Sequence, residues 1–244
     1  MTDENKLTFL GHLRELRTRI FWSVIAILVA LPVAYLLTDN FLHLLIGIAP
    51  SVELIYTEVT EMLGTYIKVT LILAFVLALP FLVYQVIIYI RPALTKRERL
   101  YVYTLLPAIF ILFCIGAVFA YLILLPPAMN FLLTFNTEIA KPMIKIANYF
   151  SVVTRLIFWV GMCFEIPLVM FFFTKIGIVK PAWLAKFRKG AILLAFVLGA
   201  IITPTFDPIN QSLVAIPIIV LYEIGILLSR LAKPKRKEIA QGSV

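Results

Sequence analysis

Six apolar runs separated by short polar segments dominate the chain. They cover approximately residues 20–37, 67–90, 100–125, 149–174, 191–202 and 213–228. Because a helix needs about 20 apolar residues to cross a bilayer, the first four runs predict membrane-spanning helices. The last two runs are shorter, and they predict either a re-entrant hairpin or two short spans under a thinned bilayer. The pair Pro126–Pro127 is expected to end the third run.

The positive charges predict which side of the membrane each polar segment occupies. Most Lys and Arg residues lie in four clusters: in the N-terminal segment, after the second run, after the fourth run, and in the C-terminal tail. In contrast, the segment 39–61 holds four acids and neither Lys nor Arg. The positive-inside rule therefore predicts six spans with both termini cytoplasmic. Residues 1–19 form an amphipathic lead-in, and residues 230–244 form a basic cytoplasmic tail.

Composition excludes a soluble domain and, together with charge placement, a nucleic-acid-binding protein. The 244-residue chain is 62% hydrophobic and 14% charged, with a mean hydropathy of +1.03. Soluble domains are about 25% charged, so this much apolar surface indicates a multi-pass, all-α integral membrane protein. The net charge of +9 comes from clusters between apolar runs, a placement typical of loops beside anionic lipid.

The inventory of catalytic residues is thin. The sequence has no GxSxG, no HExxH and no phosphate-binding glycine loop. Cys114 and Cys163 lie inside apolar runs and are expected to be small buried hydrophobic residues rather than a disulfide or metal site. We therefore expect no enzymatic activity, no metal and no cofactor.

Glu165 is the most informative single residue. It lies ten residues before Lys175, which places it about 15 Å below the cytoplasmic end of its helix, near the middle of the bilayer. An ionisable group at that depth is expensive, which favours a functional role over a neutral, hydrogen-bonded core carboxyl. One alternative function is a proton-coupled small-solute transporter with Glu165 as its relay. Such transporters usually have two repeated halves, and no internal repeat is evident.

Two further acids stand inside basic clusters on the cytoplasmic side. Glu15 lies in HLRELRTRI (12–20) and Glu98 lies in KRER (96–99). Either acid could simply balance local charge through pairs on its own helix. As a pair of carboxylates they could instead each bind one guanidinium through a forked hydrogen bond. Glu223, with Arg230 seven residues on, is expected to be structural.

Several stretches together resemble the TatC family, the core subunit of the twin-arginine protein translocase. The similarity extends in order over nearly the full chain. It is carried by HLRELRTR (12–19), PFLVYQ (80–85), IRPALTKRE (90–98), FAYLILLPPA (119–128), FEIP (164–167), ITPTFDPINQ (202–211), AIP (215–217) and YEIG (222–225).

The resemblance implies a function and a shape. It implies six helices in a concave, glove-like arrangement with the last two short, in the bacterial cytoplasmic (inner) membrane. It also implies binding of twin-arginine signal peptides and export of folded proteins driven by the protonmotive force. The implied partners are the single-span subunits TatA and TatB, together with further copies of the chain in a receptor complex.

The resemblance also assigns roles to particular residues. Signal-peptide binding would fall on Glu15 and Glu98, with Leu16, Arg17 and Tyr89 beside them. The intramembrane functional acid would be Glu165, and an outer-face polar pair would be Asp207 and Gln211. One departure is Thr60, where the family commonly has a proline, which affects the expected shape of the outer loop.

Overall fold

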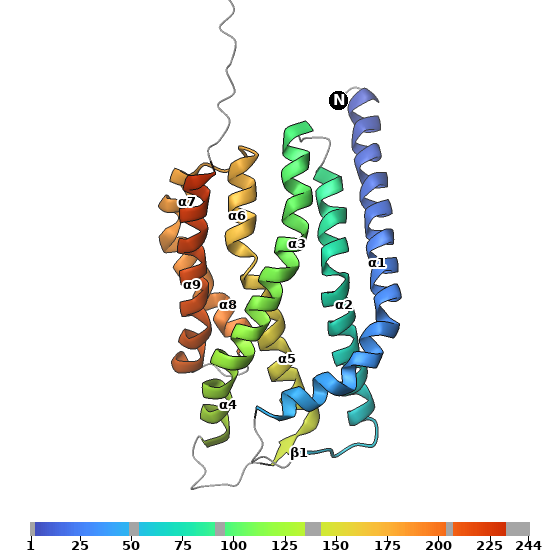
Figure 1. The fold of residues 1–244 in the computed structure, drawn as a ribbon, viewed down its shortest axis with the longest axis vertical. Coiled ribbons are helices and arrows are strands. Elements are labelled where there is room, and N and C mark those ends of the chain that lie inside the picture. Colours follow the sequence, from blue (N-terminus) through green and yellow to red (C-terminus); the bar gives the residue numbers. More distant parts are fainter. Residues whose placement is uncertain (1–2, 49–53, 91–95, 135–142, 204–206, 233–244) are drawn as a thin grey trace, which may run out of the picture.

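The computed structural model describes residues 3–48, 54–90, 96–134, 143–203 and 207–232, and almost all of them are helical (Figure 1). The elements are α1 (Asp3–Ile46), β1 (Leu54–Ile55), α2 (Glu61–Ile90), α3 (Lys96–Phe119), the π-helical turn η2 (Ala120–Leu124), α4 (Leu125–Thr134), β2 (Ile144–Lys145), α5 (Ile146–Cys163), α6 (Ile166–Lys175), α7 (Pro181–Lys186), α8 (Arg188–Ile202) and α9 (Pro208–Leu231).

The long helices stand side by side, roughly along the long axis of the molecule (Figure 1). Helices α1 and α2 pack together at one edge, α8 and α9 pack together at the other, and α3 and α5 lie between them (Figure 1). The start of α1, the end of α2, the start of α3 and the end of α6 all lie at the same end of the molecule (Figure 1). This arrangement agrees with the expected concave, six-span fold with both termini on the cytoplasmic side.

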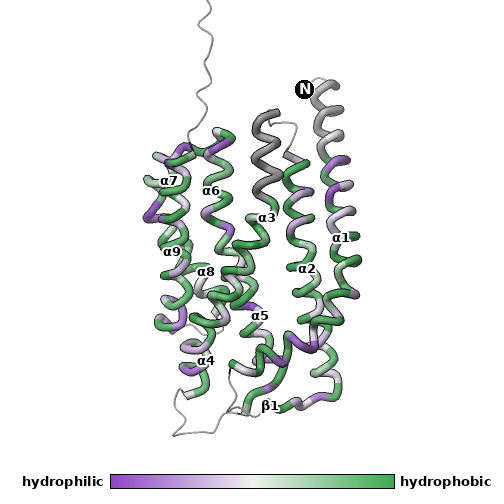
Figure 2. Tube along the Cα trace, in the orientation of Figure 1, coloured by the Kyte–Doolittle hydropathy of each residue, from purple (hydrophilic) through white to green (hydrophobic). Residues whose placement is uncertain are grey.

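Five stretches in the described part of the chain are long and apolar enough to span a membrane. These spans lie within α1, within α2, from α3 to α4, from α5 to α6, and in α9. Hydrophobic residues predominate along the middle of these helices (Figure 2). Many large apolar side chains are exposed there, as expected where the solvent is lipid rather than water.

The helices extend beyond several of the predicted apolar runs. Helix α8 has 15 residues, whereas α9 has 24 because the polar turn Pro208–Ser212 is already helical. Helix α1 has 44 residues because the polar lead-in continues the first span as one helix. Helix length alone therefore does not mark where the bilayer begins, which is better indicated by the change from polar to apolar residues.

The prediction that Pro126 and Pro127 end the third helix is wrong. The chain stays helical through η2 and α4 to Thr134. Proline has no N–H, so the pair removes two hydrogen bonds of the normal helical ladder. The chain widens into a π-helical turn just before the pair, with the N–H of Leu125 donating to the carbonyl of Ala120. Such a turn lets a helix continue past a local disruption.

The main core lies toward the outer end, where the C-terminal end of α1 meets α5. Leu45, Phe150 and Leu156 are almost fully buried there. The Tyr149 hydroxyl donates to the carbonyl of Leu45 at 2.7 Å, which satisfies an acceptor at the end of α1. At the same end, β1 pairs in parallel with β2, and Leu54 and Ile144 of these strands pack against the core.

Candidate functional site

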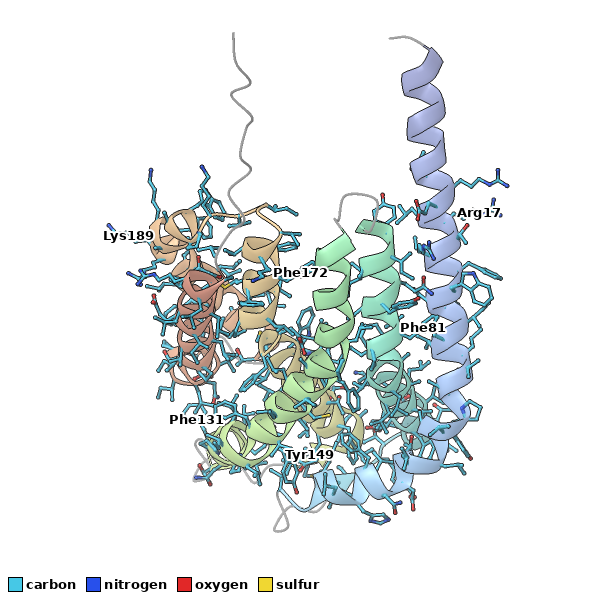
Figure 3. The ribbon with its side chains drawn as sticks, turned by 45° about the horizontal axis from the view of Figure 1, so that its top comes forward. Arg17, Phe81, Phe131, Tyr149, Phe172 and Lys189 are labelled. Atoms are coloured by element: carbon cyan, nitrogen blue, oxygen red, sulfur yellow. The ribbon has the colours of Figure 1, made fainter. Side chains whose placement is uncertain are left out.

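The residues expected to bind a signal peptide come from three helices at the cytoplasmic end. Glu15, Leu16 and Arg17 lie on α1, with Glu15 half-buried and the other two exposed. Arg17 points away from the other helices (Figure 3). Tyr89 is half-buried in the last turn of α2. Glu98 lies in the first turn of α3, and its side chain is outside the part of the chain that the structure describes.

The Glu15 carboxylate contacts a guanidinium group from its own helix. Nη2 of Arg19 lies 3.2 Å from Oε1 of Glu15, one helical turn apart. Nη1 of Arg19 donates to Oε1 of Gln85 at 3.4 Å, which connects α1 to α2. Gln85 is 5% exposed, so this amide is part of the helix packing. The sequence pointed to Glu15 but not to this contact, because Arg19 and Gln85 are 66 residues apart.

Glu165 lies at the break between α5 and α6, within a 30-residue candidate span. The sequence accounts for the break. Pro167 cannot donate to the carbonyl four residues earlier, so α5 ends at Cys163 and Pro167 takes up one of the first positions of α6. The side chain of Glu165 is therefore presented at an interruption of the helix rather than along a regular turn.

The carboxyl group of Glu165 is buried without a hydrogen-bond partner. The residue is 8% exposed, and neither side-chain oxygen is hydrogen bonded within the described residues. The surrounding packing is tight, since a Cβ at Gly161 would lie 2.7 Å from the Phe113 ring of α3. A buried polar group without a partner is costly, so this carboxyl group does not stabilise the fold through a hydrogen bond with the described residues.

Asp207 and Gln211 both connect to the backbone at the outer turn between α8 and α9. Asp207 is the N-cap of α9, and its Oδ1 accepts from the backbone N–H of Asn210 at 2.7 Å. Gln211 donates from Nε2 to the carbonyl of Phe196 in α8 at 2.8 Å. The two predicted residues are thus close in the fold, and each has a structural contact of its own.

Glu223 forms an ion pair, but with a different partner from the one that sequence spacing suggested. Its carboxylate forms a two-point ion pair with Arg188 of α8, at 2.8 Å from Nε and 2.9 Å from Nη2. The expected partner Arg230 lies on the same helix, whereas Arg188 reaches across from the neighbouring one. Sequence reasoning missed Arg188 because it lay within a cytoplasmic basic cluster and carried no individual signal.

The polar and cysteine side chains that the structure describes indicate neither a metal centre nor a disulfide. No group of three His, Cys, Asp or Glu side chains within the described ranges could hold a metal ion. Cys114 and Cys163 are both free thiols, half-buried and buried respectively. Thr60 lies in the turn before α2, where its carbonyl accepts the N–H of Gly64 at 2.9 Å.

Comparisons with known proteins agree on one family. Residues 11–217 match the model of the family described as "Sec-independent protein translocase protein (TatC)". The TatC protein of Aquifex aeolicus is 42% identical over 234 residues, covering 93% of this chain and 97% of the relative. The TatC protein of Carboxydothermus hydrogenoformans is 37% identical over 235 residues, covering 96% and 97%.

Solved structures show the same fold. A crystal structure of the twin-arginine translocase receptor TatC has 41% sequence identity and a TM-score of 0.79, covering 91% of this chain and 99% of that one. A second crystal structure of TatC, described as in DDM, gives a TM-score of 0.81 at the same identity, covering 89% and 99%.

Proposed function

Because this chain belongs to the TatC family of Sec-independent protein translocase proteins, we propose that it binds twin-arginine signal peptides at its cytoplasmic end. Glu15 and Glu98 would each bind one arginine of the peptide, with Leu16, Arg17 and Tyr89 forming the surroundings. The protein would be a multi-pass subunit of the bacterial cytoplasmic membrane, and the receptor of a complex that exports folded proteins.

The observation that carries this proposal is the chemistry at Glu15. Its half-buried carboxylate lies at the end of the molecule where the positive-inside rule places the cytoplasm, and it contacts a guanidinium group. Carboxylates bind guanidinium groups with charge-assisted, directional hydrogen bonds, which a lysine ammonium cannot match with its single point charge. Glu98 belongs to the helix that begins at the same end (Figure 1).

Membership of the family and the position of Glu165 support further proposals about partners and the energy source. TatA and TatB type subunits would assemble with this chain, which would also associate with further copies of itself. Transport would use the protonmotive force rather than ATP, with Glu165 as the intramembrane acid, and Asp207 with Gln211 would form a polar pair at the outer face. No catalysis and no cofactor are needed for these steps. The solute-transporter alternative is not favoured, because the relatives named above are translocase proteins.

The direct test is binding of a peptide with adjacent arginines to the full-length protein in lipid nanodiscs, with a Lys-Lys peptide of the same sequence as control. We expect the Arg-Arg peptide to bind and crosslink at the cytoplasmic end, and the Lys-Lys peptide to bind much more weakly. Glu98→Lys should abolish the crosslink, since it replaces attraction by repulsion. Unchanged crosslinking by this variant, or equal binding of both peptides, would overturn the proposal.

A further inference from the structure

Arg19 bridges the proposed arginine-binding carboxylate and the neighbouring helix. One end of its guanidinium group contacts Oε1 of Glu15, and the other end contacts Oε1 of Gln85. The third nitrogen, Nε, is buried and has no hydrogen-bond partner among the described residues. The side chains of Arg19 and Glu15 are 27% and 32% exposed, so the pair is partly accessible.

The geometry of the Arg19–Glu15 pair is that of a weak contact, in which another guanidinium group can replace Arg19. A strong guanidinium–carboxylate pair has two parallel hydrogen bonds of about 2.7–2.9 Å. Arg19 instead contacts one oxygen of Glu15 end-on at 3.2 Å. Pairs four residues apart on partly solvated helices are weak, and favour the paired state by only about 1.4- to 2.3-fold. An incoming guanidinium that uses both oxygens of Glu15 would form the better pair.

We infer that Arg19 is an internal competitor for Glu15, which a peptide arginine displaces when it binds. This inference rests on the proposed function of Glu15 in binding arginine. Arg19 occupies an oxygen that a forked pair needs, and two guanidinium groups on one half-buried carboxylate would leave an excess positive charge. Gln85 gives the displaced side chain an acceptor, because its 3.4 Å bond to Arg19 can shorten as Arg19 leaves Glu15.

The exchange lowers the affinity of the site for all cationic ligands. One guanidinium replaces another, so the carboxylate has a cationic partner available both before and after the peptide binds. Competition lowers the affinity for every cationic ligand by the same factor and leaves the ratio between arginine and lysine ligands unchanged. The Kd of weakly binding basic segments would thereby be too high for them to occupy Glu15.

The test measures the Kd of the Arg-Arg peptide for the full-length protein in nanodiscs. Arg19→Gln should lower this Kd by about two- to threefold, because an internal pair with equilibrium constant K raises the Kd by a factor of 1 + K. The control is Arg14→Gln, which removes the same charge from the same helix at an exposed position where, besides the bonds of the helix itself, only the backbone carbonyl is hydrogen bonded among the described residues, to the Thr18 hydroxyl. Arg14→Gln should change the Kd of the Arg-Arg peptide by less than about half as much. Arg19→Gln should lower the Kd of the Lys-Lys peptide by the same factor as that of the Arg-Arg peptide.

A double-mutant cycle separates this inference from the proposed function. Glu15→Gln should weaken peptide binding, and Arg19→Gln should have no further effect in that background. If Glu15→Gln leaves binding unchanged, both the proposed function and the competitor role fail. If Glu15→Gln weakens binding but Arg19→Gln fails to tighten it, or Arg14→Gln tightens it equally, only the competitor role fails.

A second variant tests the same exchange without altering Arg19. Gln85→Met has a similar volume but cannot accept the displaced guanidinium, so it should weaken peptide binding by about twofold. In the Arg19→Gln background the same substitution should have no effect. Tighter or unchanged binding by Gln85→Met in the otherwise native protein would overturn the role of Gln85 as the alternative acceptor for Arg19.

Discussion

Gly199 of α8 packs directly against the backbone of Gln211 of α9. A Cβ at position 199 would lie 2.9 Å from the Gln211 carbonyl oxygen and 3.3 Å from its Cγ. The Gln211 side chain meanwhile donates to the carbonyl of Phe196, three residues before Gly199 on α8. The short helix α8, which lacks the length of the other spans, is thus fixed to α9 through close backbone contact and one hydrogen bond at its outer end.

Gly199→Ala should destabilise the protein by about 1–3 kcal/mol, because the added methyl group would meet a backbone atom that cannot rotate away. The measurement is the apparent free energy of unfolding in detergent. Gly64→Ala is the matched control, since a Cβ at this helical, exposed position meets nothing within 4 Å. It should be neutral or stabilise by up to about 1 kcal/mol. Equal effects of the two substitutions would show that α8 and α9 are not closely packed.

Tyr149→Phe should cost about 1 kcal/mol of stability, because the buried carbonyl of Leu45 loses its 2.7 Å bond and keeps only the 3.3 Å bond from the Ile48 N–H. Tyr121 makes the corresponding bond to Leu44 at 3.1 Å, but that bond is exposed and water can replace it. Tyr121→Phe should therefore cost less than half as much. Unfolding of both variants in the same detergent provides the comparison, and a larger loss for Tyr121→Phe would contradict it.

Asp207→Ala should lower stability by about 0.5–2 kcal/mol, because Asp207 caps the first turn of α9 through the N–H of Asn210. Asp207→Asn keeps a capping oxygen and should lose much less. Comparing stability with transport in these two variants separates capping from a direct role at the outer face. Loss of transport in Asp207→Asn at unchanged stability would show that the charge itself is required.

Much of the fold could be predicted because membrane-spanning helices require long apolar runs, and their cytoplasmic loops are enriched in Lys and Arg. Six apolar runs and the placement of basic residues led to the number of spans and the orientation. The course of the chain at Pro126 could not be predicted in the same way, because proline can either end a helix or be accommodated by a π-helical turn. Which outcome occurs depends on packing around the helix, which no local pattern records.

In the candidate site, too, some features could be predicted from local sequence and others depended on tertiary packing. Glu165 was visible from sequence, because a single acid in an apolar run has few structural explanations. The contact between Arg19 and Gln85 was not, because it joins two helices whose relative rotation is set by tertiary packing. Gln85 did leave a weak signal, as an amide within the apolar run 67–90, but nothing in the sequence indicated its partner.

Glu165→Gln should leave binding of the Arg-Arg peptide within about twofold while reducing transport at least about tenfold. The amide has nearly the same volume, so the packing at the break between α5 and α6 is kept. What is lost is the ability of a buried group, with no hydrogen bond to any described residue, to gain and release a proton. The measurements are peptide Kd in nanodiscs and transport of a folded precursor into membrane vesicles.

Two further variants make the result at Glu165 decisive. Glu58→Gln removes an acid from the turn before α2, outside the spans, and should leave transport unchanged. Glu165→Asp keeps the acid but shortens the side chain, and should retain more transport than Glu165→Gln if proton exchange is what matters. Equal loss of peptide binding and transport in Glu165→Gln would place Glu165 in the primary receptor instead. Full transport by Glu165→Gln would reduce it to a neutral core group, because an amide at that depth cannot carry a proton through a charged state.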